Sequence, residues 1–157
     1  MKNPELNSEQ RADAVTITAL RVATGVILAA HGALKLFDLP GTVRGFAELG
    51  IPYPQYAAYF AVAGELLGGL GLIFGLLTRL AALGTWSTMA VAIGYVHFGH
   101  GLFAKNGGWE YPLVLALVSL FFVTHGAGPV SLDALFSRKR AARHHDYARS
   151  ERVRSYA

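Results

Sequence analysis

The sequence predicts an all-α integral membrane protein, a bundle of four transmembrane helices with both termini in the cytoplasm. Hydrophobic residues make up 53% of its 157 residues and charged residues only 15%, against about a quarter charged in soluble domains. Four apolar runs each approach the roughly 20 residues that cross a membrane: 14–37, 54–77, 80–98 and 109–127. A soluble helix bundle is the alternative, but these runs have almost no polar face.

The positions of the basic residues predict the orientation. Most of them lie in an amino-terminal arm (1–13), in the turn after the second run, or in a basic tail (136–157). The positive-inside rule places these three segments in the cytoplasm. The membrane domain itself is expected to span residues 14–135. We therefore expect a multi-pass protein of the inner membrane.

The first apolar run contains one charged residue in its interior, Arg21. An ionisable group at membrane depth is costly, so it needs a buried partner or a cavity. At a rise of about 1.5 Å per residue, Arg21 lies about 10 Å from the cytoplasmic surface if the helix leaves that surface near Ala14. It is therefore a candidate functional residue.

The second run supplies the expected partner, Glu65. The linker 38–53 contains Pro40, Gly41, Gly50 and Pro52, which bracket a short interfacial helix. If the second helix enters near Pro54, Glu65 lies about 16 Å from that surface, hence roughly 14 Å from the cytoplasmic face. We expect a buried Arg21–Glu65 ion pair. It either fixes the helix register, holds a polar head group or relays protons.

The third and fourth runs complete a second group of polar residues. Thr78 and Arg79 separate the second run from the third in a tight hairpin, and the linker 99–108 precedes the fourth. His31 and Lys35 are one helical turn apart and share a face. His97 ends the third run and Glu110 opens the fourth at the same membrane boundary. These four residues are the candidate ligand-binding set.

Several ligands fit such a set of residues. A quinone accepts hydrogen bonds at its two carbonyl oxygens from His or Lys, while its ring packs against Phe37, Phe98 or Trp109. Two histidines on parallel helices can also hold a b-type haem, or a metal with Glu110. No further cofactor motif supports these two options, so neither haem nor metal is expected. A hydrogen-bonded pocket without a ligand, or snorkelling side chains, remains the alternative.

The remaining features narrow the chemistry and the partners. Ser131 is a plausible N-cap of a surface helix, with Asp133 in its first turn. The basic tail that follows favours anionic membrane lipids as partners over nucleic acid. The chain has no cysteine, which excludes thiol redox chemistry within it. It also has no dinucleotide fingerprint, P-loop or nucleophile elbow, so the pattern leaves open whether the chain is an enzyme.

The order of several segments resembles a known family. Arg21 is followed by HGALKLF (31–37), AGELLGGLGLIFGLLTRLAAL (63–83), KNGGWEYPL (105–113) and GPVSLD (128–133). This combination, covering about residues 14–135, resembles the DoxX family of small four-helix bacterial membrane proteins. The resemblance implies that the polar positions which recur in the family are Arg21, Lys35, Glu65, Arg79 and Glu110.

The resemblance also implies two functional hypotheses. Some relatives are linked to thiosulfate:quinone oxidoreduction, and others to membrane-bound redox complexes or quinone detoxification. The first hypothesis is therefore a quinone-linked redox protein, or the membrane subunit of an oxidoreductase complex, with another membrane or redox protein as its partner. The second is a non-catalytic accessory subunit that docks a larger membrane complex.

Overall fold

The protein is helical throughout the part that the structure describes. A computed structural model describes the backbone of residues 7–154 and the side chains of residues 7–143, and this part contains no strand. The main helices are α1 (Ser8–Phe37), α2 (Leu39–Glu48), α3 (Pro54–Val62), α4 (Gly68–Phe74), α5 (Thr78–Val91), α6 (Glu110–His125) and α7 (Leu132–Arg154). Two π-helical segments, η1 (Ala63–Leu67) and η2 (Ala92–His97), and two short 3₁₀ turns, Phe98–His100 and Ala104–Asn106, complete the chain. The predicted all-α class is confirmed.

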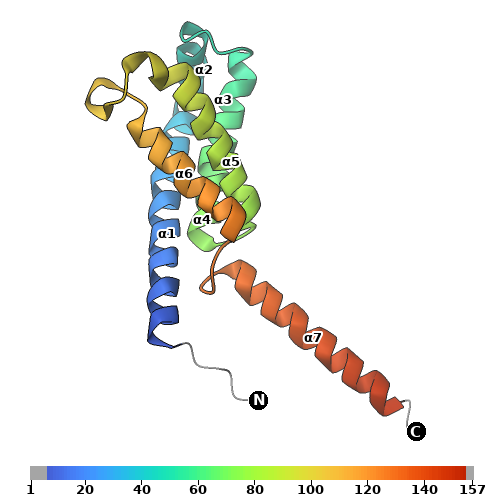
Figure 1. Cartoon of the computed structure of the whole chain (residues 1–157). Coiled ribbons are helices and arrows are strands. Elements are labelled where there is room, and N and C mark those ends of the chain that lie inside the picture. Colours follow the sequence, from blue (N-terminus) through green and yellow to red (C-terminus); the bar gives the residue numbers. More distant parts are fainter. Residues whose placement is uncertain (1–6, 155–157) are drawn as a thin grey trace.

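Four helical rods form the bundle: α1, the continuous rod α3–η1–α4, α5 with η2, and α6 (Figure 1). At one end of the bundle lie α2 and the linker between η2 and α6. At the other end lie the α4–α5 turn, the start of α1 and the start of α7, which projects away from the bundle (Figure 1). Helices α1 and α7, the first and last that the structure describes, therefore both start at this second end of the bundle, which we call the end where the chain ends lie.

Among the described residues, two helices are long and apolar enough to cross a membrane, Ser8–Phe37 and Pro54–Phe74. The apolar helix Glu110–His125 is shorter. The first of these helices starts six residues before the apolar run because Asn7 and Gln10 form a capping box, each side chain bonding the other's backbone N–H. The expected four crossings and their orientation stay predictions.

Glycines set the spacing and register of α1 against the α3–η1–α4 rod. A Cβ on Gly25 would lie 2.7 Å from the carbonyl oxygen of Gly69, and one on Gly69 would lie 2.5 Å from the amide nitrogen of Ala29. A Cβ on Gly32 would overlap the backbone of Leu66. Because only glycine fits, the two helices pack backbone to backbone, as small residues permit in membranes.

The hairpin between the second and third runs turns earlier than predicted. Helix α4 ends at Phe74, and Gly75 takes the left-handed conformation with φ 63°. Leu77 is also left-handed, with φ 46°, and α5 begins at Thr78. Thr78 and Arg79 therefore belong to the first turn of α5, so the prediction that they separate the helices is corrected.

Candidate functional site

Arg21 is buried near the end of the bundle where the chain ends lie. The residue is only 2% exposed. One terminal nitrogen donates to the carbonyl oxygen of Leu72 at 3.0 Å, and the other donates to that of Val130 at 2.7 Å. The first acceptor lies in the last turn of α4, where a cation is favoured by the helix dipole. Arg21 thus joins α1, α4 and the segment before α7.

The expected Arg21–Glu65 ion pair is not formed. Helix α1 and the second rod (α3–η1–α4) are antiparallel, with Gly32 beside Leu66 and Gly25 beside Ile73. Continuing that register places Arg21 beyond the end of α4 at Phe74, and its side chain reaches the carbonyl of Leu72. Leu72 is about seven residues from Glu65, or about 10 Å along the rod. Both charges are buried as predicted, but each has a different partner.

Asp133 completes the polar group around Arg21. Its two carboxylate oxygens accept the backbone N–H groups of Leu77 and Thr78 at 2.8 and 2.9 Å. Leu77, the N-cap residue of α5, makes no side-chain cap of its own, so Asp133 caps α5 from the first turn of α7. Burial raises the pKa of Asp133, but the hydrogen bonds from Thr78 and Leu77 and the charge of Arg21 together lower the pKa below its ordinary value.

Glu65 pairs instead with Lys35 in the half of the bundle near α2. The Nζ atom of Lys35 lies 2.5 Å from a carboxylate oxygen of Glu65, and the two side chains are 26% and 4% exposed. Glu65 belongs to η1, a π-helical segment within the second rod. π-bulges inside α-helices occur frequently at functional sites. The Lys35–Glu65 pair is therefore the principal candidate site.

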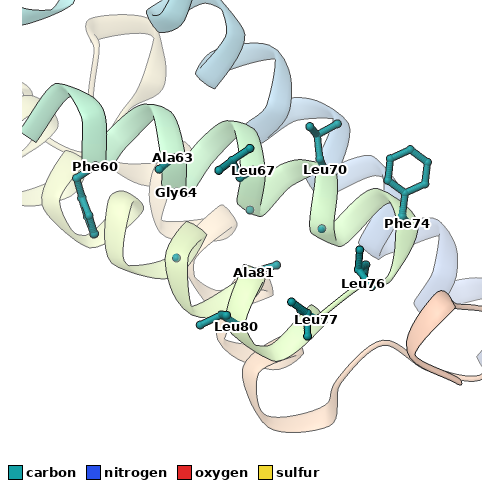
Figure 2. A pocket seen from close by; sticks show the side chains of 13 residues that line it. Phe60, Ala63, Gly64, Leu67, Leu70, Phe74, Leu76, Leu77, Leu80 and Ala81 are labelled. Atoms are coloured by element: carbon teal, nitrogen blue, oxygen red, sulfur yellow. The ribbon is translucent and has the colours of Figure 1, made fainter. Parts of the chain in front are cut away.

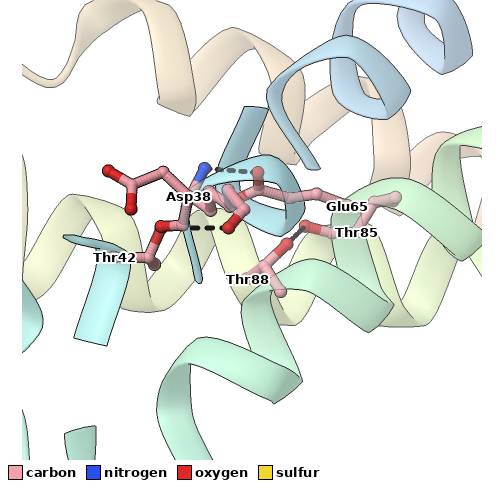
Figure 3. A network of polar contacts seen from close by, with 6 residues as sticks. Asp38, Thr42, Glu65, Thr85 and Thr88 are labelled. Atoms are coloured by element: carbon pink, nitrogen blue, oxygen red, sulfur yellow. Dashed lines mark hydrogen bonds and ion pairs between the residues drawn. The ribbon is translucent and has the colours of Figure 1, made fainter. Parts of the chain in front are cut away.

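Hydroxyl groups lie on both sides of this pair (Figure 3). The Thr42 hydroxyl donates to the backbone carbonyls of Lys35 and Asp38 at 3.2 and 3.0 Å, which fixes the end of α1 against α2. On α5, the Thr88 hydroxyl donates to the Thr85 carbonyl at 2.9 Å. These bonds satisfy the threonines locally and leave the charges of Lys35 and Glu65 to each other.

Two cavities meet at the ion pair, because Lys35, Glu65 and Ala92 line both of them. The smaller, about 140 Å³, is also lined by His31, His97 and Tyr111. The larger, about 410 Å³, is lined mainly by aromatic and apolar residues of α2, α3, α5 and η2. Its aromatic side chains are Phe46, Tyr53, Tyr56, Phe60 and Tyr95. The Lys35–Glu65 pair thus lies between the two cavities. We call the smaller one the histidine cavity and the larger one the aromatic cavity.

The structure brings three of the four predicted ligand-binding residues together, namely His31, Lys35 and His97. A ring nitrogen of His97 lies 2.6 Å from the carbonyl oxygen of Gly107, so the imidazole is tied to the linker before α6. Glu110 lines neither cavity. Its carboxylate accepts the backbone N–H of Ala104 at 2.6 Å and stabilises that same linker.

The predicted ring contacts also change. Phe37 and Phe98 are 86% and 68% exposed and line neither cavity. The aromatic wall comes mainly from Tyr53 at the N-cap of α3, from Tyr56 and Phe60 of α3, and from Tyr95 of η2, none of which was predicted to contact a ligand. Their spacing, with Tyr53, Tyr56 and Phe60 at intervals of three and four, is the signal that could have found them.

Comparisons with known proteins agree with one another. A family model described as DoxX matches residues 16–98. "Putative oxidoreductase CatD" of Bacillus subtilis is 34% identical over 73% of this chain and 81% of its own. An uncharacterized protein of Haemophilus influenzae is 32% identical over 76% of this chain and 90% of its own. "Inner membrane protein YphA" of Escherichia coli is 30% identical over 76% and 89%, respectively. No solved structure matches.

Proposed function

The chain belongs to the DoxX family and is a membrane protein, and from that premise we propose that it binds a quinone beside the Lys35–Glu65 pair. In this role it is a multi-pass protein of the bacterial inner membrane with four crossings and cytoplasmic termini. It acts in quinone-linked redox chemistry, either by itself or as the membrane subunit of an oxidoreductase complex. The name of the Bacillus relative, "Putative oxidoreductase CatD", supports the redox assignment.

The observation that carries the proposal is a partly buried ion pair that lines two cavities of different chemistry. The aromatic cavity, about 410 Å³, lies within the range of about 300–1,000 Å³ typical of small-molecule sites. Its tyrosine and phenylalanine rings suit a flat ring, and the Lys35 ammonium suits a carbonyl oxygen of that ring. Lys35 is the residue that polarises the quinone oxygen in this proposal.

We give the smaller cavity, about 140 Å³, a different task, because it is lined by two histidines and lacks the row of aromatic side chains that lines the larger one. It has room for several waters. His31 and His97 line it, and histidine is a common general acid and base and proton shuttle in proteins. We assign this cavity to proton exchange between the aqueous side and the ion pair.

The division of tasks matches what quinone reduction needs. A quinone becomes a quinol by gaining two electrons and two protons. Lys35, Glu65 and the histidines provide a route for the protons, and the electrons come from a reduced donor held by a partner protein. Because the chain has no cysteine, a thiol donor would belong to that partner.

The test measures quinone binding by the full-length protein in lipid nanodiscs. We expect Lys35→Met to weaken binding by about tenfold or more, since a hydrogen bond to a charged group contributes about 1.5–3 kcal/mol. Glu65→Gln removes the charged partner that holds Lys35 in place and should weaken binding to a smaller extent. The matched controls are Lys105→Met and Glu48→Gln, two exposed residues that line neither cavity. If folded Lys35→Met and Glu65→Gln proteins bind quinone as the wild type does, the site is assigned wrongly.

A non-catalytic accessory subunit is the second candidate. The observation that favours it is α7, which leaves the bundle (Figure 1) and begins with exposed basic residues, Arg138, Lys139, Arg140 and Arg143. Such a helix suits anionic lipids or an acidic partner. This function predicts that the chain purifies in mild detergent in stoichiometric association with a larger enzyme and binds no quinone.

A further inference from the structure

An apolar groove runs along the outside of the hairpin formed by the second rod and α5. It has a volume of about 490 Å³, and the residues that line it are all apolar or glycine. Figure 2 shows Phe60 at one end of the groove and Leu76 and Leu77 at the other, next to the turn between α4 and α5. Gly64 and Gly68 form part of its floor, where α5 approaches the rod closely.

The groove continues the aromatic cavity of the proposed quinone site. Phe60 lines both, so its ring stands between them. On α5 and η2, the residues that line the groove and then the cavity follow one helical stripe: Leu77, Leu80, Ala81, Gly84, Thr88, Val91, Ala92 and Tyr95. The two spaces are therefore successive sections of one channel between the same pair of helices.

We propose that this groove holds the isoprenoid tail of the quinone, so that the ligand is a long-tailed lipoquinone and not a small soluble quinone. The inference rests on the proposed function, because it takes the ring to lie beside Lys35. From Phe60 to Phe74 the rod advances about 21 Å. A tail that leaves the ring at Phe60 can thus lie along the whole groove, toward the end of the bundle where the chain ends lie.

The lining favours such a tail over other occupants. A phospholipid needs a partner for its phosphate at the end of the acyl chain, and the described residues that line the groove include no charged or hydroxyl side chain. A tail that is covalently attached to the bound ring needs only apolar contact. Large exposed side chains such as Leu67 and Leu80, 64% and 66% exposed, provide that contact.

The experiment compares one quinone ring without a tail and with a tail of several isoprene units, in full-length wild-type and variant proteins. Leu80→Trp and Ala63→Phe enlarge exposed residues that line the groove. The matched control is Leu83→Trp, which enlarges an exposed residue of α5 outside the groove. Bound quinone is counted by native mass spectrometry in a mild detergent at equal quinone-to-detergent ratio.

We expect the long-tailed quinone to bind Leu80→Trp and Ala63→Phe about tenfold more weakly than the wild type, while the tailless ring binds all proteins alike. Equal binding of the long-tailed quinone to wild type and groove variants would overturn the tail assignment and leave the ring site standing. The tail assignment would also be overturned if the groove variants lose a bound phospholipid, or a second copy of the chain, while their quinone binding is unchanged. If neither quinone binds the wild type, the proposed function itself fails.

Discussion

The bundle contains two buried polar groups that look alike in sequence and differ in surroundings. In the first group, the Arg21 guanidinium donates to the carbonyls of Leu72 and Val130, and the Asp133 carboxylate accepts two backbone N–H groups. Around Lys35 and Glu65, one charged side chain binds another, and a cavity lies on each side. We call these the Arg21–Asp133 cluster and the Lys35–Glu65 site.

The difference separates architecture from function. Backbone groups are fixed by the course of the chain, so the Arg21–Asp133 cluster holds α1, α4, α5 and α7 in one arrangement. Side chains can exchange a partner for a ligand, and the space beside Lys35 and Glu65 allows that exchange. A buried charge in a membrane helix thus indicates a function most strongly when its partner is a side chain next to a cavity.

The largest expected effect is that of Arg21→Met. It removes two hydrogen bonds from a charged donor and leaves the carbonyls of Leu72 and Val130 without that partner. We expect a loss of about 3 kcal/mol or more in the free energy of unfolding, measured by thermal unfolding in detergent. The quinone affinity of the protein that remains folded should not change.

The control for Arg21 is Arg79→Met. The Arg79 guanidinium donates to the carbonyl of Thr124 at 3.2 Å from an exposed position, so its removal should cost less than about 1 kcal/mol. An Arg21→Met protein that is as stable as the wild type but no longer binds quinone would reverse the roles of the two regions.

An intermediate effect is expected from Asp133→Asn. The asparagine amide has one oxygen, so it can replace only one of the two carboxylate oxygens that accept a backbone N–H. We therefore expect the free energy of unfolding to fall by about 1–2 kcal/mol. The lowered pKa of Asp133 means that its carboxylate stabilises the wild type above about pH 4 and that this contribution is lost as the pH falls below that value. The variant should show less of this acid-induced loss.

Thermal unfolding of both proteins between about pH 3 and about pH 7 provides the measurement. Asp38→Asn is the matched control, since Asp38 accepts the N–H of Gly41 as a local cap of α2, a role that asparagine fills equally well. A steep loss of stability in acid that Asp133→Asn leaves unchanged would show that Asp133 does not act through its charge.

The smallest effect is expected at Glu110. Glu110→Ala removes the hydrogen bond from Ala104 and should cost about 1 kcal/mol, while Glu110→Gln keeps an acceptor and should cost less. Neither variant should change quinone affinity in nanodiscs, because Glu110 lines neither cavity. A weakened affinity in Glu110→Gln would extend the Lys35–Glu65 site to the linker before α6.

The sequence was sufficient for the helices and for several of their ends. The fourth apolar run, predicted over 109–127, corresponds to α6 at Glu110–His125. The predicted cap at Ser131 is confirmed, since its hydroxyl accepts the N–H of Ala134 at 3.1 Å. Hydropathy and capping are local properties, and local properties can be read from neighbouring residues.

The partners of the buried charges could not be predicted by counting depth. That count takes Pro54 as the level where the second helix enters the membrane, but with Gly32 beside Leu66 the second rod begins about seven residues, or about 10 Å, beyond the level of Phe37. The spacing of Gly25, Gly32 and Gly69 contained the true register. The π turns at Glu65 and His97 and the cavities beside them arise from packing, which no local pattern in the chain predicts.

The cap of α5 has a consequence for biosynthesis. The backbone N–H groups of Leu77 and Thr78 are capped by the carboxylate of Asp133, which follows them in the chain by more than fifty residues. Because the chain is synthesised from its amino terminus, the α4–α5 hairpin forms while the start of α5 is still uncapped. The cap can form only after α7 has been synthesised. Translation arrested before Asp133 should leave a cysteine introduced at Thr78, which is 1% exposed in the folded chain, accessible to thiol-directed labels, whereas release of the complete chain should protect it.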